Sequence, residues 1–535
     1  MKSKITLLTM LMALITSAVF SQSMISENKT ELSRAQQKNE MDFALRNYQT
    51  NGVTVFFEPE KAEKVRGEKR KYQRYEMALD ESLKVVDEGY KIIGTKNSVK
   101  PRLYFDDFRI GYTTWVDDET DDKVNKIMFQ LIKYDNNNVI TSVKDFEMCD
   151  EKGFDSYRVV TYEGKVFVMA QYEKRKTKNK DEKNRDYLVF MRINPVAMDV
   201  EVQKELNLLG KDELGLESFL VTKDKIFLAG KSLLQTKVLG WKIPKGFIAF
   251  RLSLDGDEEA RGEITIPAGM GIANIYMAEN NGMLYMAGEY GDPKAMGKAP
   301  KMPANNKTVK VSNPYLGMFI KKFDFNLQEQ ATATFDYKEK VLRKLKKGNA
   351  GFTKKGGNYN LQDFYFLPDG SFYITAEMFT KFYETRVTKT QYLTIYNYYT
   401  HYNYMDALLF KFTPNGELDW VNQIDRDNYR KTYSGHIRSQ KPLDPGKLIT
   451  FLGPDDKLAM LYNTPGRKYG KKRFGLSEVI VSRDGQMTDP YDFTSNAEFG
   501  LLDDGIIPLD PNTVIAVGTD KKGDFLWTKK ISLFR

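Results

Sequence analysis

The sequence predicts an all-β fold and, within that class, a β-propeller. From about residue 100 to the C-terminus, a two-part unit recurs with a period of about 60 residues. Each half of the unit contains two stretches of β-forming residues joined by a short turn such as PDG, NNG or PNG, which is typical of a hairpin. Four antiparallel strands in every period, repeated along one chain, indicate the blades of a propeller.

The first half of the unit ends on a small residue. Its clearest copies read YEGKVFVMAQ, TKDKIFLAGK, ENNGMLYMAGE and LPDGSFYITAE. We expect the small residue to lie where neighbouring blades pack closely, which is a structural role. With the copies aligned on their turns, it falls at Ala170, Gly230, Gly288, Ala376 and Gly518.

The second half is a strand, a turn and a strand, as in DYLVFMRINP, GFIAFRLSLDG and DALLFKFTPNG. It completes the four strands of the unit and carries a recurring basic residue. That residue is Lys133, Arg192, Arg251, Lys322 and Lys411 in successive copies.

The tiling of these units predicts seven blades. An incomplete unit at each end suggests that strands from both termini share one closing blade, because a closed ring has no edge strands. Six or eight blades remain compatible, since the first full copy fits the pattern least well. Residues 22–52 are polar and are expected to form a leader or short helix before a single propeller domain at 53–535. The six fuller copies lie at 100–148, 154–208, 216–267, 272–337, 361–425 and 446–493.

The N-terminus reads as a secretory signal peptide at residues 1–21. Lys2 and Lys4 precede an apolar run, and Val19 and Ser21 suit a cleavage before Gln22. No later segment has the roughly 18 apolar residues of a membrane span. We therefore expect an exported protein, in the periplasm or outside the cell, with no transmembrane segment after signal removal.

The chain has one cysteine, Cys149, so no intrachain disulfide can form despite the predicted export. A nucleophilic role for Cys149 would need a nearby base, and neither histidine lies near it in the sequence. Stability must therefore come from burial in a large core.

The copy DALLFKFTPNGELDW resembles a bacterial β-propeller repeat with Asp-Ala, hydrophobic residues, Lys, a Gly turn and a final Trp. Together with the signal peptide, the high Lys and Tyr content and the scarcity of Cys, the chain resembles uncharacterised secreted propellers of Bacteroidetes-type bacteria. This resemblance implies a fold and not an activity. The Gly-x-x-x-Trp ending is also similar to quinoprotein repeats, but only Trp420 and Trp527 show it, which argues against a quinone-dependent dehydrogenase.

Tight turns and long connections should occupy opposite faces of the ring. The long connections join strands two and three or lead to the next unit, so antiparallel geometry places them on one face. The connections on that face carry a net charge of about +20, whereas the whole chain carries +9. They lie at 171–186, 231–246, 289–315, 338–360, 378–405, 426–446 and 463–475.

This basic face has two interpretations. It could be a solvated, lysine-rich surface that keeps the protein soluble, or it could concentrate an anionic partner. In an exported protein, that partner would be an acidic polysaccharide, lipopolysaccharide or an envelope protein, and not nucleic acid. The candidate binding cations are Lys344, Lys346, Lys347, Lys471, Lys472 and Arg473.

One long connection, YLTIYNYYTHYNYMD, is rich in tyrosine. Tyrosine offers a flat apolar face and a polar tip, which suits sugar rings and protein interfaces alike. The alternative is a long hairpin that packs on itself. The candidate binding residues are Tyr396, Tyr398, Tyr399 and Tyr402.

The best catalytic candidates combine both histidines with tyrosine and arginine. A lyase acting on uronic-acid polymers needs an arginine to neutralise the carboxylate and a Tyr or His to take the α-proton. The residues available for these roles are His401, His436, Arg430, Arg438 and Tyr399. No metal-site, cofactor or nucleotide motif is present in the sequence.

These observations favour a secreted, non-catalytic binding or scaffold propeller that presents its basic, Tyr-rich face to an anionic glycan or envelope partner. Two alternatives remain: a lyase or hydrolase of acidic polysaccharides, and a structural subunit of an envelope protein complex.

Overall fold

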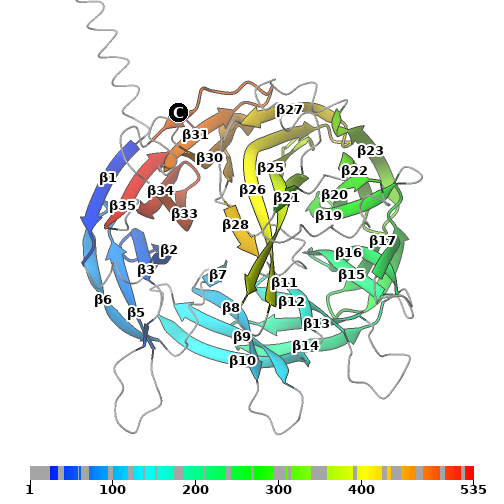
Figure 1. Ribbon diagram of the computed structural model, residues 1–535, viewed down its shortest axis with the longest axis horizontal. Coiled ribbons are helices and arrows are strands. Elements are labelled where there is room, and N and C mark those ends of the chain that lie inside the picture. The colour runs from blue at the N-terminus through cyan, green and yellow to red at the C-terminus, as the bar shows by residue number, and fades with distance from the viewer. Residues whose placement is uncertain are drawn as a thin grey trace, which may run out of the picture.

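The structure is a ring of eight antiparallel sheets, seen face-on in Figure 1. It is a computed structural model, in which the following residues are described: 24–33, 41–57, 60–61, 72–93, 101–105, 107–117, 125–135, 139–150, 154–173, 186–208, 213–235, 242–266, 270–292, 308–310, 315–338, 358–389, 394–424, 431–434, 448–465, 474–493, 500–519 and 524–534. Among them, no helix is long and apolar enough to cross a membrane.

We number the blades in chain order. Blade 1 has β2 (Met41–Asn47), β3 (Gly52–Phe57), β5 (Tyr72–Leu79) and β6 (Val85–Ile93), with β4 (Glu60–Lys61) beside β5. Blade 2 has β7 (Pro101–Tyr104), β8 (Phe108–Asp117), β9 (Lys126–Asp135) and β10 (Ile140–Asp150). Blade 3 has β11 (Phe154–Tyr162), β12 (Lys165–Glu173), β13 (Asp186–Asn194) and β14 (Asp199–Leu206). Blade 4 has β15 (Glu213–Val221), β16 (Lys225–Gln235), β17 (Lys242–Ser253) and β18 (Glu258–Glu263).

The second half of the ring follows the same plan. Blade 5 has β19 (Gly271–Asn280), β20 (Met283–Gly291), β22 (Tyr315–Asp324) and β23 (Glu329–Asp336). Blade 6 has β24 (Asn358–Phe366), β25 (Phe372–Lys389), β26 (Thr394–Phe412) and β27 (Leu418–Ile424), with β21 (Thr308–Lys310) and β28 (Lys431–Ser434) added. Blade 7 has β29 (Ile449–Leu452), β30 (Leu458–Pro465), β31 (Phe474–Val481) and β32 (Tyr491–Asp492), with the 3-10 turn η4 (Pro454–Asp456). Blade 8 has β33 (Gly500–Asp510), β34 (Thr513–Thr519), β35 (Phe525–Ser532) and β1 (Met24–Glu31).

Both termini close the ring, as predicted, but the prediction of seven blades is wrong. β1 pairs with the C-terminal β35 and completes blade 8. β2 supplies the inner strand of blade 1, so the incomplete N-terminal unit is a full blade of its own. Both strands lie within 22–52, whose polar sequence predicts a leader or short helix. The segment MISENKTE is polar because an outermost strand faces solvent, and its polarity conceals its role. Residues 1–23 lie outside the described part of the chain.

The core is a series of hydrophobic clusters between neighbouring blades. Ala170 belongs to a cluster shared by blades 2 and 3, and Ala376 to one shared by blades 5 and 6; both are fully buried. Gly230 differs, because a Cβ there would lie 2.5 Å from the carbonyl oxygen of Gly215 on the inner strand of the same blade. The small residue therefore relieves crowding between blades at the alanines and within one blade at Gly230.

Candidate functional site

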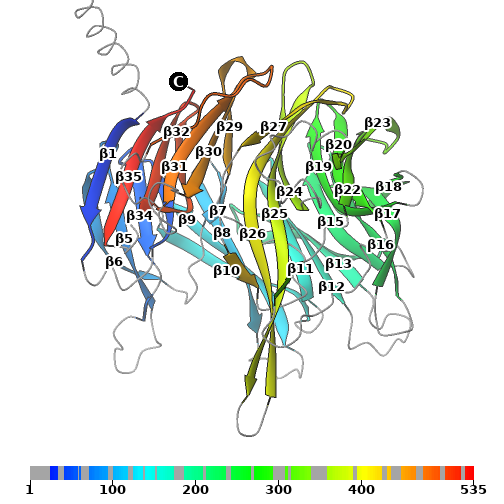
Figure 2. The same cartoon turned by 45° about the horizontal axis from the view of Figure 1, so that its top comes forward.

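A long hairpin extends blade 6 across the face of the ring that carries the long connections. Its strands, β25 and β26, have 18 and 19 residues. β21 pairs with β25 and β28 pairs with β26, which makes a small sheet in the order β21-β25-β26-β28 that we call the platform. In Figure 1 the platform runs over the middle of the ring, and in Figure 2 its tip projects beyond the blades. Three separate connections therefore combine into one structure on this face.

The Tyr-rich connection belongs to β26, which pairs with β25 in a long hairpin, and a binding role for its tyrosines stays a prediction. Directly paired residues of antiparallel strands share one face of the sheet. Tyr398 pairs with Thr385, which is buried, whereas Tyr399 pairs with Glu384. His401 pairs with Phe382 and, on its other side, with Tyr433.

The register therefore divides the predicted tyrosines between two faces. Tyr396, Tyr398 and Tyr402 share the face of the buried Tyr383. Tyr399 lies on the other face, which also carries the half-exposed Arg386. The register places the predicted tyrosines on both faces of the hairpin, and their role in binding stays a prediction.

The remaining predicted site residues lie outside the described part of the chain. Their roles in anion binding or catalysis therefore stay predictions. They are Lys344, Lys346, Lys347, Lys471, Lys472, Arg473, His436, Arg430 and Arg438.

A buried cluster of tyrosine and glutamate lies at the base of the long-connection face, in blades 5 and 6. Glu289, on β20, is fully buried and accepts a hydrogen bond from the hydroxyl of Tyr337 at 2.9 Å. The ring of Tyr337 lies 4.4 Å from that of Tyr359, at the start of the next blade. The charge of the same carboxylate also acts on Tyr276 and Tyr315. We call these five residues the tyrosine–glutamate cluster.

Burial dominates the electrostatics of this cluster. It raises the pKa of Tyr276, Tyr315 and Tyr337 above the ordinary tyrosine value, and the nearby Glu289 carboxylate raises each of them further. The hydroxyl groups therefore stay protonated at neutral pH, and that of Tyr337 donates to Glu289. A general base needs a pKa near the working pH, so the raised pKa makes these tyrosines poor general bases.

An ion pair in the neighbouring blade extends the polar region toward blade 4. Lys231 Nζ lies 2.7 Å from Glu217 Oε1, and both side chains are mostly buried. The charges of Glu217 and Arg158 also act on Tyr276. The inner end of blades 3 to 5 therefore carries charged groups of both signs.

A recurring polar position in the sequence also indicates this region. The polar residue directly after each recurring small residue is Gln171, Lys231, Glu289 and Glu377 in four copies. Gln171 accepts a hydrogen bond from the backbone N–H of Leu216, at 3.0 Å, in the next blade. Because strand residues alternate in direction, a polar residue there in a buried strand indicates an internal polar network.

The recurring basic residue has a structural role on the opposite, tight-turn face. Arg192 donates to the carbonyl oxygen of Leu254 at 3.1 Å and to Asp255 at 2.8 Å, both in the turn of the following blade. Arg251 makes the equivalent bonds to Phe325 and Asn326 one blade further on. We call these contacts inter-blade clasps.

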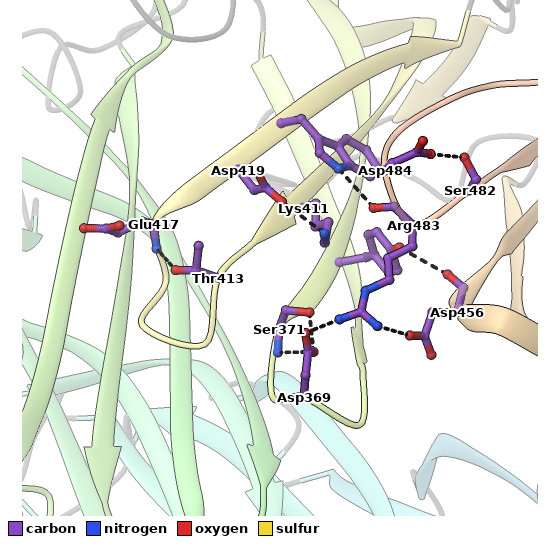
Figure 3. Close-up of polar contacts among 12 residues, drawn as sticks. Asp369, Ser371, Lys411, Thr413, Glu417, Asp419, Asp456, Ser482, Arg483 and Asp484 are labelled. Carbon is purple, nitrogen blue, oxygen red and sulfur yellow. Dashed lines mark hydrogen bonds and ion pairs between the residues drawn. The ribbon is translucent and has the colours of Figure 1, made fainter.

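The junction of blades 6 and 7 uses a different clasp, shown in Figure 3. Arg483 pairs with Asp369 of blade 6 and, at 2.9 Å, with Asp456 of its own blade. Trp420 donates from its indole N–H to the carbonyl oxygen of Arg483 at 3.3 Å. Hydrogen bonds from Ser371 lower the pKa of Asp369, and Arg483 lowers it further. This face is therefore held together by charged contacts between neighbouring turns.

Cys149 is buried on β10, and burial raises the pKa of its thiol to about 12. A thiol with that pKa stays protonated at neutral pH and is a poor nucleophile. Among the residues that the structure describes, no group of three or more His, Cys, Asp or Glu side chains could hold a metal ion.

Comparison with known proteins does not assign a family. No protein-family model and no curated protein matches the sequence. Among solved structures, the polysaccharide lyase Uly1 matches at 10% identity and a TM-score of 0.37, over 96% of this chain and 100% of that one. A protein of unknown function from Bacteroides caccae matches at 10% identity and a TM-score of 0.24, over 64% and 89%. Apocarotenoid oxygenase of Synechocystis matches at 9% identity and a TM-score of 0.29. That match covers 56% of this chain and 62% of the oxygenase.

Proposed function

We propose that this protein is an exported, non-catalytic binding propeller, and that the platform is where it holds an anionic glycan. The observation that carries the proposal is the platform itself. β21 and β28 come from two other long connections and pair with opposite edges of the β25–β26 hairpin. A blade needs only four strands, so this added sheet serves something other than the closure of blade 6.

Two further properties support a glycan as the ligand. Tyrosine-bearing strands offer flat faces with polar tips, which suit sugar rings. The excess of positive charge, +9 for the chain, favours a polymer of negative charge.

The test is a binding assay of mature protein against acidic polysaccharides, lipopolysaccharide and their neutral counterparts, at low and physiological salt. The matched variant replaces residues 381–402 with an Asn-Gly turn, so that the Thr380–Asn403 pair becomes the last of the hairpin. We expect loss of selective binding while the ring still melts in one cooperative transition.

Equal binding by the intact and shortened proteins would contradict the platform as the binding surface. Release of an unsaturated uronate product, abolished in His401→Ala, would instead establish the lyase alternative. Binding of an envelope protein without any glycan would favour the structural-subunit alternative.

A further inference from the structure

A second cluster of aromatic and cationic residues lies on the opposite, tight-turn face, where blades 1, 2 and 8 meet. Tyr48 lies in the turn between β2 and β3, and Tyr104 is the last residue of β7. Arg46 lies on β2, just before the β2–β3 turn. Arg109 pairs directly with Tyr104 across the β7–β8 hairpin. All four residues lie at the inner ends of their blades, away from the outer clasps.

The two arginines are held in place mainly by backbone carbonyl groups. Arg109 is 1% exposed and donates to the carbonyl oxygen of Arg46 at 2.6 Å. Arg46 donates to the carbonyl oxygen of Leu509, in blade 8, also at 2.6 Å. Within the described ranges, Arg46 makes no ion pair, and its Nε is buried without a hydrogen-bond partner. Carbonyl oxygens fix the position of a guanidinium group but do not cancel its charge.

The tyrosine rings lie over these cations and still face solvent. The guanidinium carbon of Arg46 is 4.8 Å from the centroid of the Tyr48 ring, and that of Arg109 is 5.1 Å from it. Arg109 is also 5.8 Å from the Tyr104 ring. Tyr48 is 53% exposed and Tyr104 55%.

The turn that carries Tyr48 is well defined. The side-chain oxygen of Asn47 accepts hydrogen bonds from the backbone N–H groups of Gln49 and Thr50, at 3.0 and 3.2 Å. The amide of Asn47 donates to Thr54 at 3.0 Å. A fixed turn lowers the entropic cost of using Tyr48 as a contact surface.

We infer that Arg46, Arg109, Tyr48 and Tyr104 form a second binding site, for a carboxylated sugar unit such as a uronic acid. The Arg46 guanidinium faces the carboxylate, because guanidinium matches carboxylate geometry with paired N–H donors. The exposed tyrosine rings take the C–H face of the sugar. A simple carboxylate would need only the cation. The half-exposed tyrosine rings beside that cation match a sugar ring that carries a carboxylate.

This site goes beyond the proposed function, because it uses no residue of the platform and lies on the other face of the ring. The two can fail separately. The protein with the shortened hairpin lacks the platform and keeps the second site, so it is the proper background for the test.

The experiment is calorimetric titration of the intact and shortened-hairpin proteins with oligogalacturonate and with its methyl ester. The ester has the same ring and no charge. We expect the acid to bind both proteins and the ester to bind at least tenfold more weakly, as loss of a charge-assisted contact implies. Arg46→Gln should weaken acid binding about tenfold, and Arg46→Lys, which keeps the charge but loses the fork, by less.

Tyr48→Ala and Tyr104→Ala should each weaken binding about fivefold, the loss of one stacking ring. Both residues are exposed, so these variants should fold even if Arg46→Gln does not. Tyr90→Ala, at an exposed tyrosine on β6, is the matched control and should have no effect. Equal affinity for acid and ester, or full binding in both tyrosine variants, would overturn the site. So would tighter binding of an oligoglutamate peptide, which would identify an acidic protein as the ligand.

Discussion

Arg251 and Arg46 both lie toward the tight-turn face, yet their guanidinium groups have different partners. Arg251 donates to a carbonyl oxygen and a side chain of the next blade, and it lies 3.2 Å from Glu259 in its own blade. Arg46 has a carbonyl oxygen and an aromatic ring, and no carboxylate within the described residues. The first arginine uses its charge to hold the fold, whereas the second keeps its charge available to a ligand.

The same contrast separates the two faces of the ring. The outer part of the tight-turn face repeats one type of contact from blade to blade, because each turn must hold its neighbour. On the long-connection face a polar residue also recurs, at Gln171, Lys231, Glu289 and Glu377, but the platform occurs at one place only among the described blades. Features that repeat around a ring are best explained by the ring, and features that do not repeat are the better candidates for function.

The largest expected effect is a loss of stability on the tight-turn face. Gly416 lies in a turn of blade 6 with φ of +83°, and a Cβ there would lie 2.6 Å from Ile320 of blade 5. Gly416→Ala should lower the free energy of unfolding by about 2–4 kcal/mol through backbone strain and overpacking. Gly164→Ala is the control, since its φ is +73° but nothing lies within 4 Å. It should cost only about 1 kcal/mol, and equal losses by chemical denaturation would refute the inter-blade contact.

Removal of a clasp should have a smaller effect. Arg251→Met leaves the Phe325 carbonyl oxygen and the Asn326 side chain without their donor, which should cost about 2 kcal/mol. Arg46→Met should cost about 1 kcal/mol, since it loses one such bond. Denaturant titration of both variants measures the difference. A larger loss at Arg46 would mean that this arginine holds the fold, as Arg251 does.

Within the tyrosine–glutamate cluster, Tyr337→Phe removes the hydroxyl that donates to the buried Glu289. A buried carboxylate that loses a donor destabilises the fold, here by about 1–2 kcal/mol. Tyr285→Phe, at a buried tyrosine outside the cluster, is a comparison variant. If Tyr337→Phe were neutral at pH 7, the bond would have no part in holding blades 5 and 6 together.

The smallest effect is on alkaline stability. The pKa of buried Tyr337 lies above that of an unfolded tyrosine, 10.0, so the unfolded state ionises first as the pH rises. Stability from this group is complete below pH 10.0 and is lost above it, by up to about 1.4 kcal/mol per pH unit for each such tyrosine. The free energy of unfolding, measured by denaturant titration between about pH 9 and 11, should therefore fall less steeply with pH in Tyr337→Phe than in the natural protein. Identical slopes would indicate that the hydroxyl is accessible to water.

The sequence by itself determined the all-β class, the repeat, the closure by both termini and the separation of tight turns from long connections. These follow from local chemistry, since hairpin turns and alternating strands depend on nearby residues. The clasp residues Arg192 and Arg251 were also visible as a recurring basic position, although their partners were not. Those partners lie about 62 to 75 residues away in the sequence.

Only the tertiary structure decided the blade number, the platform and the second site. β1 is polar and becomes recognisable as a strand only when β35, at the other end of the chain, lies beside it. The platform depends on pairing between connections from blades 5 and 6, whose register no local pattern specifies. Arg46, Tyr48 and Arg109 stand on two different blades and meet because the ring places their turns side by side. Contacts between distant segments are set by packing of the whole ring, which a single strand does not encode.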